Sequence, residues 1–391
     1  MTNKNTFKFC LLYFFYSWTI AILTTTITLV YNHMGNNSVE IGVALSTTTF
    51  IAFFSQFILG YISDAIKSNK LVFIFGLGIT LCVSVLFFRT NPLISMLAFA
   101  ACLGLFYAPM TTILDVWVLM SVSPDSKYDF AFIRSWCALG AGVFSVVYCW
   151  LLDKLGFGIT LWFTIPIMLA TIIMAMGMKN TAAQNSQVEK KIKEKISLSV
   201  LAAIFKNSRY TITIISYAFV GIASSAEIMM LPLRIKLSGG TTFYSGVSIF
   251  ILMISQWLTL MFYKKVQRRI SVSTLFMLGN LLYFVYFLCQ ATAFTPLMIA
   301  IVTIGNGVSY GIYFPSLRQI LFDSSHKEVR TFAQSVSDAI GLGICGAIGG
   351  VVGGKFVSYS SGRVLMLICA GFTAMAIALV VADKIRRSKT A

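Results

Sequence analysis

The chain has 391 residues, of which 58% are hydrophobic and only 11% are charged, and its mean hydropathy is +0.84. Soluble proteins carry roughly a quarter of charged residues, so this composition excludes a soluble globular protein. The formal net charge of +17 does not indicate nucleic-acid binding, because the basic residues lie in short loops between apolar segments. No nucleic-acid partner is therefore expected.

Twelve long apolar segments follow one another along the chain. A helix needs about 20 mostly apolar residues to cross the hydrocarbon core, and in lipid the backbone must satisfy its own hydrogen bonds. We therefore predict an all-α membrane protein with 12 transmembrane helices in two six-helix pseudo-repeats. The predicted helices span residues 7–31, 39–66, 71–89, 92–121, 129–152, 157–178, 209–233, 243–263, 271–291, 295–322, 328–356 and 361–383.

The basic residues predict the orientation of the chain. The N-terminus, the even-numbered loops and the C-terminus hold 22 of the 30, while the other side holds six, Arg234 among them. Arg134 and Arg318 fall within helices. The positive-inside rule then places both termini in the cytoplasm of a multi-pass protein of the cytoplasmic (inner) membrane.

The longest polar stretch follows the sixth helix. It predicts a cytoplasmic linker at 179–208, with a short surface helix over Leu198–Phe205, between an N-terminal six-helix bundle (1–178) and a C-terminal six-helix bundle (209–391). Such a division is typical of transporters built from repeats.

Cysteine and histidine usage argues against metal or disulfide chemistry. The eight cysteines show no CxxC or Cys/His spacing, and the two histidines, His33 and His326, fall in predicted loops. We expect no disulfide framework, no metal and no cofactor. The first apolar run, from Phe7 to Tyr31, is too long for a cleavable signal.

The charged residues inside the predicted helices are chiefly Asp115, Arg134, Glu227 and Asp338. A lone charge at the centre of a membrane helix costs about 2.5–3.5 kcal/mol, so these residues are the primary candidates for function. Asp115 and Arg134 lie on helices joined by a short loop and could pair in a cavity, where the guanidinium can bind a carboxylate or sugar hydroxyls. A purely structural ion pair near the cytoplasmic end is the alternative.

Other side chains could contribute to substrate binding. Trp136 offers a ring on which a sugar or an aromatic substrate could stack, or it simply packs in the core or against lipid. The neutral polar candidates are Gln56, Gln256 and Gln334, which could equally form hydrogen bonds between helices. Arg318 could contribute to the site or extend to the cytoplasmic interface. The glycines of the eleventh helix predict a smooth packing surface.

Glu227 and Asp338 are the candidate proton carriers. A carboxyl buried in an apolar helix can gain and lose a proton near neutral pH, which is the property that proton coupling needs. The alternative for each is a structural carboxyl that stays protonated.

The loop after the second helix resembles the signature of the major facilitator superfamily, a Gly followed by an Asp and then basic residues. Gly60 would permit close helix approach, and Asp64 could cap a helix or pair with a base. The usual Arg and Gly are replaced by Ala65 and Ser68. The residues that carry this resemblance are Gly60, Asp64, Lys67 and Lys70.

Longer stretches resemble particular groups of that superfamily. Residues 50–64 are similar to the second helix of the lactose permease group. Residues 107–115, followed by 129–140, resemble the phenylpropionate permease and oligosaccharide:proton symporter families, with Cys137 in place of a Gly. The resemblance implies the major facilitator fold and secondary transport.

The coupling residues of lactose permease do not carry over as a set. Its seventh-helix carboxylate corresponds to Glu227, and its eleventh-helix Lys lies close to Asp338. The tenth-helix His and Glu correspond to Tyr310 and Tyr313, and the eighth-helix Glu corresponds to Gln256. We therefore count Tyr310, Tyr313 and Gln256 among the candidate substrate contacts.

The sequence thus predicts a monomeric secondary active transporter, not an enzyme. Its expected partners are membrane lipids, protons and a small organic solute, with a sugar or an aromatic acid favoured, imported by proton symport with alternating access. Proton-driven efflux of sugars, drugs or siderophores is the alternative within transport. A receptor or scaffold on a transporter fold is the alternative outside it.

Overall fold

The computed structural model describes residues 3–87, 93–121, 130–178, 205–325 and 336–390. Within them, 12 helices are long and apolar enough to span a membrane, and these ranges contain no strand. The predicted fold class is confirmed.

The first half contains α1 (Asn3–Ile20), η1 (Ala21–Thr25), α2 (Ile27–His33), α3 (Ser38–Ile66), α4 (Asn69–Phe87), α5 (Leu93–Cys102), η2 (Leu103–Tyr107), α6 (Met110–Ser121), α7 (Phe130–Leu155) and α8 (Ile159–Met176). The second half contains α11 (Ser208–Leu237), α12 (Thr242–Gln267), α13 (Val272–Thr292), α14 (Pro296–Val302), α15 (Ile304–Asp323), η4 (Ala339–Cys345), α17 (Gly346–Phe356), η5 (Tyr359–Gly362) and α18 (Arg363–Thr390).

The helix boundaries agree with the predicted ones to within a few residues, except at the C-terminus of the last helix and where residues lie outside the described ranges. Polar caps explain several of the starts: Asn207 accepts from the backbone N–H of Arg209 at 3.0 Å, and Ser271 accepts from that of Thr274 at 3.3 Å. Such caps satisfy donors that a helix leaves without partners in its first turn. The proposed surface helix lies outside the described residues, apart from Phe205.

Three of the spans contain a π-helical turn: η1, η2 and η4. A π-helical turn changes the direction in which the following side chains point, and such turns are frequent at functional sites. η2 ends at Tyr107, and η4 begins directly after Asp338. Two of the three turns therefore adjoin residues of the candidate site.

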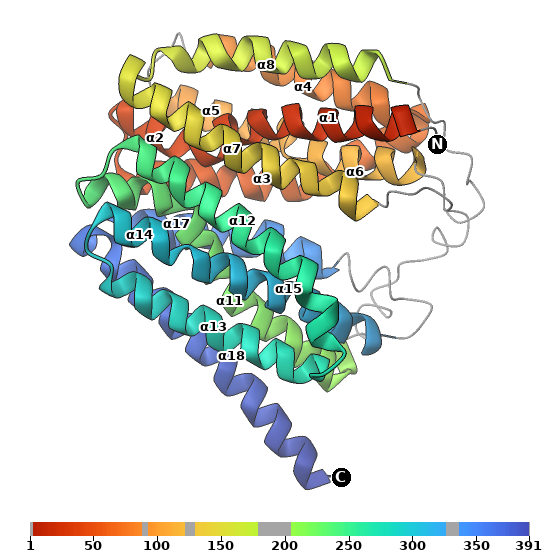
Figure 1. Cartoon of the computed structure of the whole chain (residues 1–391), viewed down its shortest axis with the longest axis vertical. Coiled ribbons are helices and arrows are strands. Elements are labelled where there is room, and N and C mark those ends of the chain that lie inside the picture. Colours follow the sequence, from red (N-terminus) through yellow and green to blue (C-terminus); the bar gives the residue numbers. More distant parts are fainter. Residues whose placement is uncertain (1–2, 88–92, 122–129, 179–204, 326–335, 391) are drawn as a thin grey trace.

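The two halves of the chain form two groups of helices. Figure 1 shows α1 to α8 above and α11 to α18 below. The groups meet where α7 packs against α12 and α3 packs against α17. The backbones of α3 and α17 are in direct contact, as small residues permit. A Cβ on Gly42 would come within 2.5 Å of the carbonyl oxygen of Gly350, so no side chain fits at this position.

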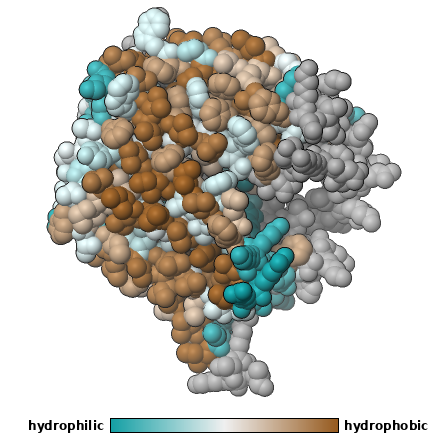
Figure 2. Space-filling view, viewed as in Figure 1, coloured by the Kyte–Doolittle hydropathy of each residue, from teal (hydrophilic) through white to brown (hydrophobic). Residues whose placement is uncertain are grey.

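The outer surface is apolar, as a membrane-spanning bundle requires. Figure 2 shows hydrophobic residues over much of the middle of one face, with hydrophilic residues nearer its edges. Large apolar side chains are highly exposed, for example those of Ile94, Trp162 and Phe75. Lipid would cover this surface.

Polar contacts join the two halves at the end opposite the chain termini. Thr28 donates to the carbonyl of Met229 at 3.0 Å, and Lys236 donates to the side chain of Asn32 at 2.6 Å. The carboxylate of Asp153, at the end of α7, accepts from two backbone N–H groups at the start of α12. The two N···O distances are 2.8 and 2.7 Å. A carboxylate of the first half therefore caps a helix of the second half.

Replacing Asp153 with Asn should loosen this end of the molecule. An amide has one acceptor oxygen and no charge, so it cannot satisfy both N–H groups of α12. Spin labels at Lys154 and Ser238 should therefore show a larger populated fraction of long distances. Glu40→Gln is the matched control. This substitution removes an equal charge at the same end, but the Glu40 carboxylate accepts from Asn37 within its own half of the molecule. Equal distance distributions in the two variants would contradict a holding role for Asp153.

Candidate functional site

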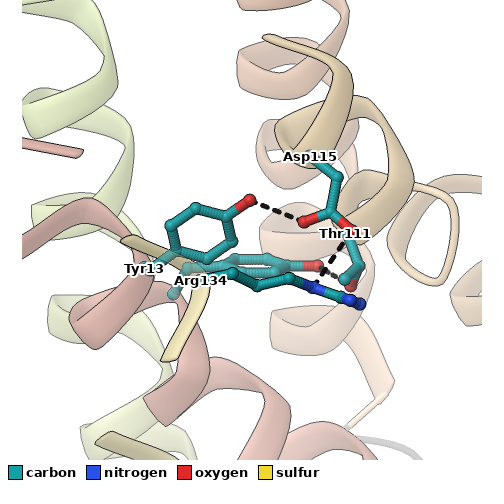
Figure 3. A network of polar contacts seen from close by, with 5 residues as sticks. Tyr13, Thr111, Asp115 and Arg134 are labelled. Carbon is teal, nitrogen blue, oxygen red and sulfur yellow. Dashed lines mark hydrogen bonds and ion pairs between the residues drawn. The ribbon is translucent and has the colours of Figure 1, made fainter. Parts of the chain in front are cut away.

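Asp115 and Arg134 form an ion pair, as the sequence predicts. Nε of Arg134 on α7 lies 3.2 Å from Oδ2 of Asp115 on α6. The hydroxyl of Tyr13 on α1 donates to Oδ1 of the same carboxylate at 2.5 Å. The Asp115 side chain is 18% exposed and that of Arg134 54% exposed. Figure 3 shows the far end of the guanidinium directed away from Asp115.

A second layer of hydroxyl groups adjoins the ion pair. Tyr16 shares a hydrogen bond of 2.9 Å with Thr111, which lies one turn before Asp115 on α6. Thr19 shares one of 2.8 Å with Tyr107, at the end of η2. Tyr13, Tyr16 and Thr19 recur every three residues on α1 and so share a face. Sequence analysis did not identify these residues. Their shared spacing on α1 is a signal in the sequence, but it does not distinguish them from the other hydroxyl side chains of the spans.

Trp136 packs into an aromatic cluster with α1. Its ring meets those of Phe7 and Phe14 edge-on, with centroid distances of 6.4 and 6.3 Å. The side chain is only partly buried. It lies two residues from Arg134, near the same end of α7.

A second ion pair lies in the other half. Arg318, late in α15, pairs with Asp338, which directly precedes η4. Both side chains are partly exposed, and Arg318 lies over the ring of Phe314. Together with Phe314, Pro315, Gln319 and Phe322, all on α15, Arg318 lines an open hollow of about 570 Å³.

Tyr310 connects the two halves of the candidate site. It lies on α15 within electrostatic reach of Arg134 from the first half and of the Arg318–Asp338 pair. Its ring stacks on that of Phe314, with centroids 5.0 Å apart. The neighbouring Tyr313 is buried against Phe276 instead, and its side chain is only 2% exposed.

The remaining predicted positions vary in how they are placed. Gln56 on α3 and Gln256 on α12 are partly buried, while Gln334 lies outside the described residues. At the motif after the second helix, Lys67 adopts a left-handed backbone conformation between α3 and α4. Lys70 donates to the carbonyl of Met176, the last residue of α8, at 2.7 Å and to that of Met178, just beyond it, at 2.6 Å. Gly60 lies within α3, and the side chain of Asp64 is outside what the structure describes.

Glu227 is buried at the centre of a polar network in the second half. Its side chain, on α11, is 1% exposed. Oε1 accepts from the hydroxyl of Tyr286 on α13 at 2.7 Å, and Oε2 accepts from the amide of Asn306 on α15 at 2.9 Å. Gln290 donates to the Tyr286 hydroxyl at 3.3 Å. A buried carboxyl needs such partners to be tolerated.

The structure corrects the assignment of Arg234 to a loop. It lies within α11, its side chain is only 1% exposed, and its guanidinium donates to Gln290. Asn306 and Gln290 also escaped sequence analysis. Both are amides within predicted spans, and that polar character was the available signal.

Comparison with known proteins agrees with this architecture. The model of the MFS_1 like family matches residues 7–368. A mutant of the nucleoside transporter NupG has a similar structure, with a TM-score of 0.83 at 18% identity, covering 96% of this chain and 99% of that one. A bacterial homologue of the human lysosomal transporter Spinster, inward-facing and unoccupied, gives 0.68 at 13% identity, covering 97% and 94%. No curated protein shows significant similarity to the sequence.

Proposed function

The chain belongs to the MFS_1 like family and is a multi-pass membrane transporter rather than an enzyme; from this premise we propose that it imports a neutral, ring-bearing polar solute by proton symport. The favoured substrates are nucleosides and sugars. The observation that carries the proposal is the pairing of Arg134 with Asp115 and of Arg318 with Asp338.

Charge balance favours a neutral substrate over an aromatic acid. Arg134 is paired with Asp115, and Arg318 is paired with Asp338. A carboxylate substrate would add a negative charge to pairs that are already balanced, whereas hydroxyl groups can accept from the guanidinium and donate to the carboxylate within an intact pair. The partly exposed Trp136 and Tyr310 would supply rings for stacking. A nucleoside, which NupG is named for transporting, combines hydroxyl groups with an aromatic base.

The proton carrier that we propose is Glu227. Asp338 is paired with a guanidinium and its side chain is 42% exposed, whereas Glu227 is buried and accepts from the neutral donors Tyr286 and Asn306. A buried carboxylate is costly and a buried carboxylic acid is not. Taking up a proton would therefore stabilise Glu227 in its apolar surroundings.

Alternating access would use the two halves, 1–178 and 209–391, as the units that rock around a central site. The hydrogen bonds of Asp153, Lys236 and Thr28 lie at one end of their interface. We propose that these contacts close the extracellular end and break when the transporter opens outward.

Substrate-dependent proton uptake tests the proposed function. Purified protein in vesicles is given nucleosides, sugars or aromatic carboxylates without an imposed gradient. Entry of a nucleoside or sugar together with a proton should make the interior more acidic, whereas antiport would make it more alkaline. Thermal stabilisation by aromatic carboxylates alone would contradict the charge-balance argument.

The orientation is tested separately. Because 22 of the 30 basic residues lie on one side, both termini are expected in the cytoplasm. A fluorescent protein fused after Ala391 should fluoresce in intact cells, and alkaline phosphatase fused there should be inactive. Phosphatase activity from that fusion would contradict the proposed orientation.

A further inference from the structure

A buried cation lies two helical turns from Glu227 on the same helix. Nη1 of Arg234 donates to the side-chain oxygen of Gln290, and Nη2 donates to the backbone oxygen of the same residue at 2.5 Å. No carboxylate of the described residues forms an ion pair with this guanidinium. Arg234 is therefore a buried charge whose nearest partners are neutral, which is rare unless the charge has a function.

The fold makes space for this side chain. A Cβ on Gly362 would come within 2.8 Å of the Arg234 side chain, so only glycine fits there. In the same turn, Ser360 and Ser361 adopt positive φ angles of 48° and 53°. Such angles are uncommon for residues other than glycine, and strained backbone often occurs at functional sites.

Arg234 fixes the orientation of the Gln290 amide. A guanidinium has only donors, so the amide oxygen of Gln290 must face it. Nε2 of Gln290 then donates to the carbonyl of Ile299 at 3.2 Å and to the hydroxyl oxygen of Tyr286 at 3.3 Å. The reversed amide would set donors against Arg234 and an acceptor against the carbonyl of Ile299.

The orientation of the Gln290 amide determines that of the Tyr286 hydroxyl, which contacts Glu227. Because the Tyr286 oxygen accepts from Gln290, its own proton is directed to Oε1 of Glu227. Oε1 is thereby held as an acceptor. Oε2 faces the amide of Asn306, which can offer a donor or, after turning over, an acceptor. The two oxygens of Glu227 are therefore not equivalent.

We infer that Arg234, acting through Gln290 and Tyr286, holds Glu227 ready to release its proton, and that the proton binds at Oε2 beside Asn306. Arg234 is then a positioning residue and the internal counter-charge of the ionised carboxylate. This inference rests on the proposed role of Glu227 in proton coupling. Among the described residues, the other ionisable side chains within electrostatic reach of Glu227 are Tyr283 on α13 and Cys369 on α18, neither of which is a cation or a carboxylate. Arg363, at the start of α18, lies within electrostatic reach of Arg234.

Infrared difference spectroscopy of the full chain in membranes tests the inference. The carboxyl band that Glu227→Gln removes reports the protonated acid directly, without any transported substrate. In Arg234→Gln this band should persist to a pH about one unit higher or more, the shift expected when a stabilising interaction of the carboxylate is lost. The pH profile of substrate exchange should move with it.

Gln290→Glu is the sharper variant. It keeps the size of the side chain and gives Arg234 a carboxylate partner, so the fold should be retained. It removes the Nε2 donor, however, and the Tyr286 hydroxyl can then turn away from Glu227. The band of Glu227 should shift in the same direction as in Arg234→Gln. Arg234→Lys, which keeps a buried cation and a donor, should stay close to the parent.

Lys355→Gln is the matched control, because Lys355 is a cation in the last turn of α17, outside the network. If the band titrates at the parental pH in both Arg234→Gln and Gln290→Glu, the inference is wrong, even where Glu227→Gln abolishes accumulation and the proposed function stands. If Glu227→Gln leaves pH-driven accumulation intact, the proposed proton site is wrong and the inference falls with it.

Discussion

Replacing Arg134 with Lys should weaken substrate binding by about 10- to 100-fold, the range expected for losing a hydrogen bond to a charged group. In the structure, Nε of Arg134 pairs with the Asp115 carboxylate, while the far end of the guanidinium is directed away from that carboxylate. A lysine has one nitrogen on a flexible chain. It cannot hold Asp115 and contact a substrate in the same geometry.

The measurement is the dissociation constant of the nucleoside or sugar that most stabilises the purified protein against heat, together with its apparent affinity for transport. Arg209→Lys is the matched control, because this substitution makes the same chemical change away from Asp115 and Arg134, at a guanidinium that donates to Ser273. An unchanged affinity in Arg134→Lys would mean that the Asp115–Arg134 pair is structural. Our assignment of the substrate site would then be wrong.

The ion pair could be predicted because membrane burial penalises isolated charges. Asp115 and Arg134 stand in segments that are otherwise apolar, and a short loop joins their helices, so pairing was the most economical arrangement. Tyr13 and Thr111 could not be selected in the same way. Tyrosine and threonine are common in these spans, and only the packing of α1 against α6 and α7 decides which hydroxyls meet the carboxylate.

Arg234 illustrates the opposite limit of sequence reasoning. It lies one residue beyond the predicted end of its helix, where a charged residue normally marks the start of a loop. The apolar pattern cannot reveal that the helix continues to Leu237, nor that Gly362 and Gln290 enclose the guanidinium. Those residues are over 50 positions away in the chain, and only the tertiary fold brings them together.

Replacing Glu227 with Gln should abolish uphill accumulation while leaving exchange of substrate across the membrane intact. An amide keeps the size of the protonated carboxyl, and its oxygen can still accept from the Tyr286 hydroxyl. It cannot release a proton, however. The new NH₂ group would take the place of Oε2 and face Asn306. The Asn306 side chain can turn over so that its amide oxygen accepts from this group. The fold and the equilibrium between the conformations of the substrate-free transporter should therefore be retained, and only proton coupling should be lost.

Asp338→Asn separates this outcome from simple damage to the site. Its partner Arg318 would keep its charge without the carboxylate that now pairs with it, so we expect weaker binding of a neutral substrate and slower transport of every kind. Accumulation would fall in both variants, but counterflow at saturating substrate would fall only in Asp338→Asn. If instead Glu227→Gln accumulates substrate in response to a pH gradient, the proton must bind elsewhere. Asp115 would be the next candidate, because its side chain is 18% exposed whereas that of Asp338 is 42% exposed.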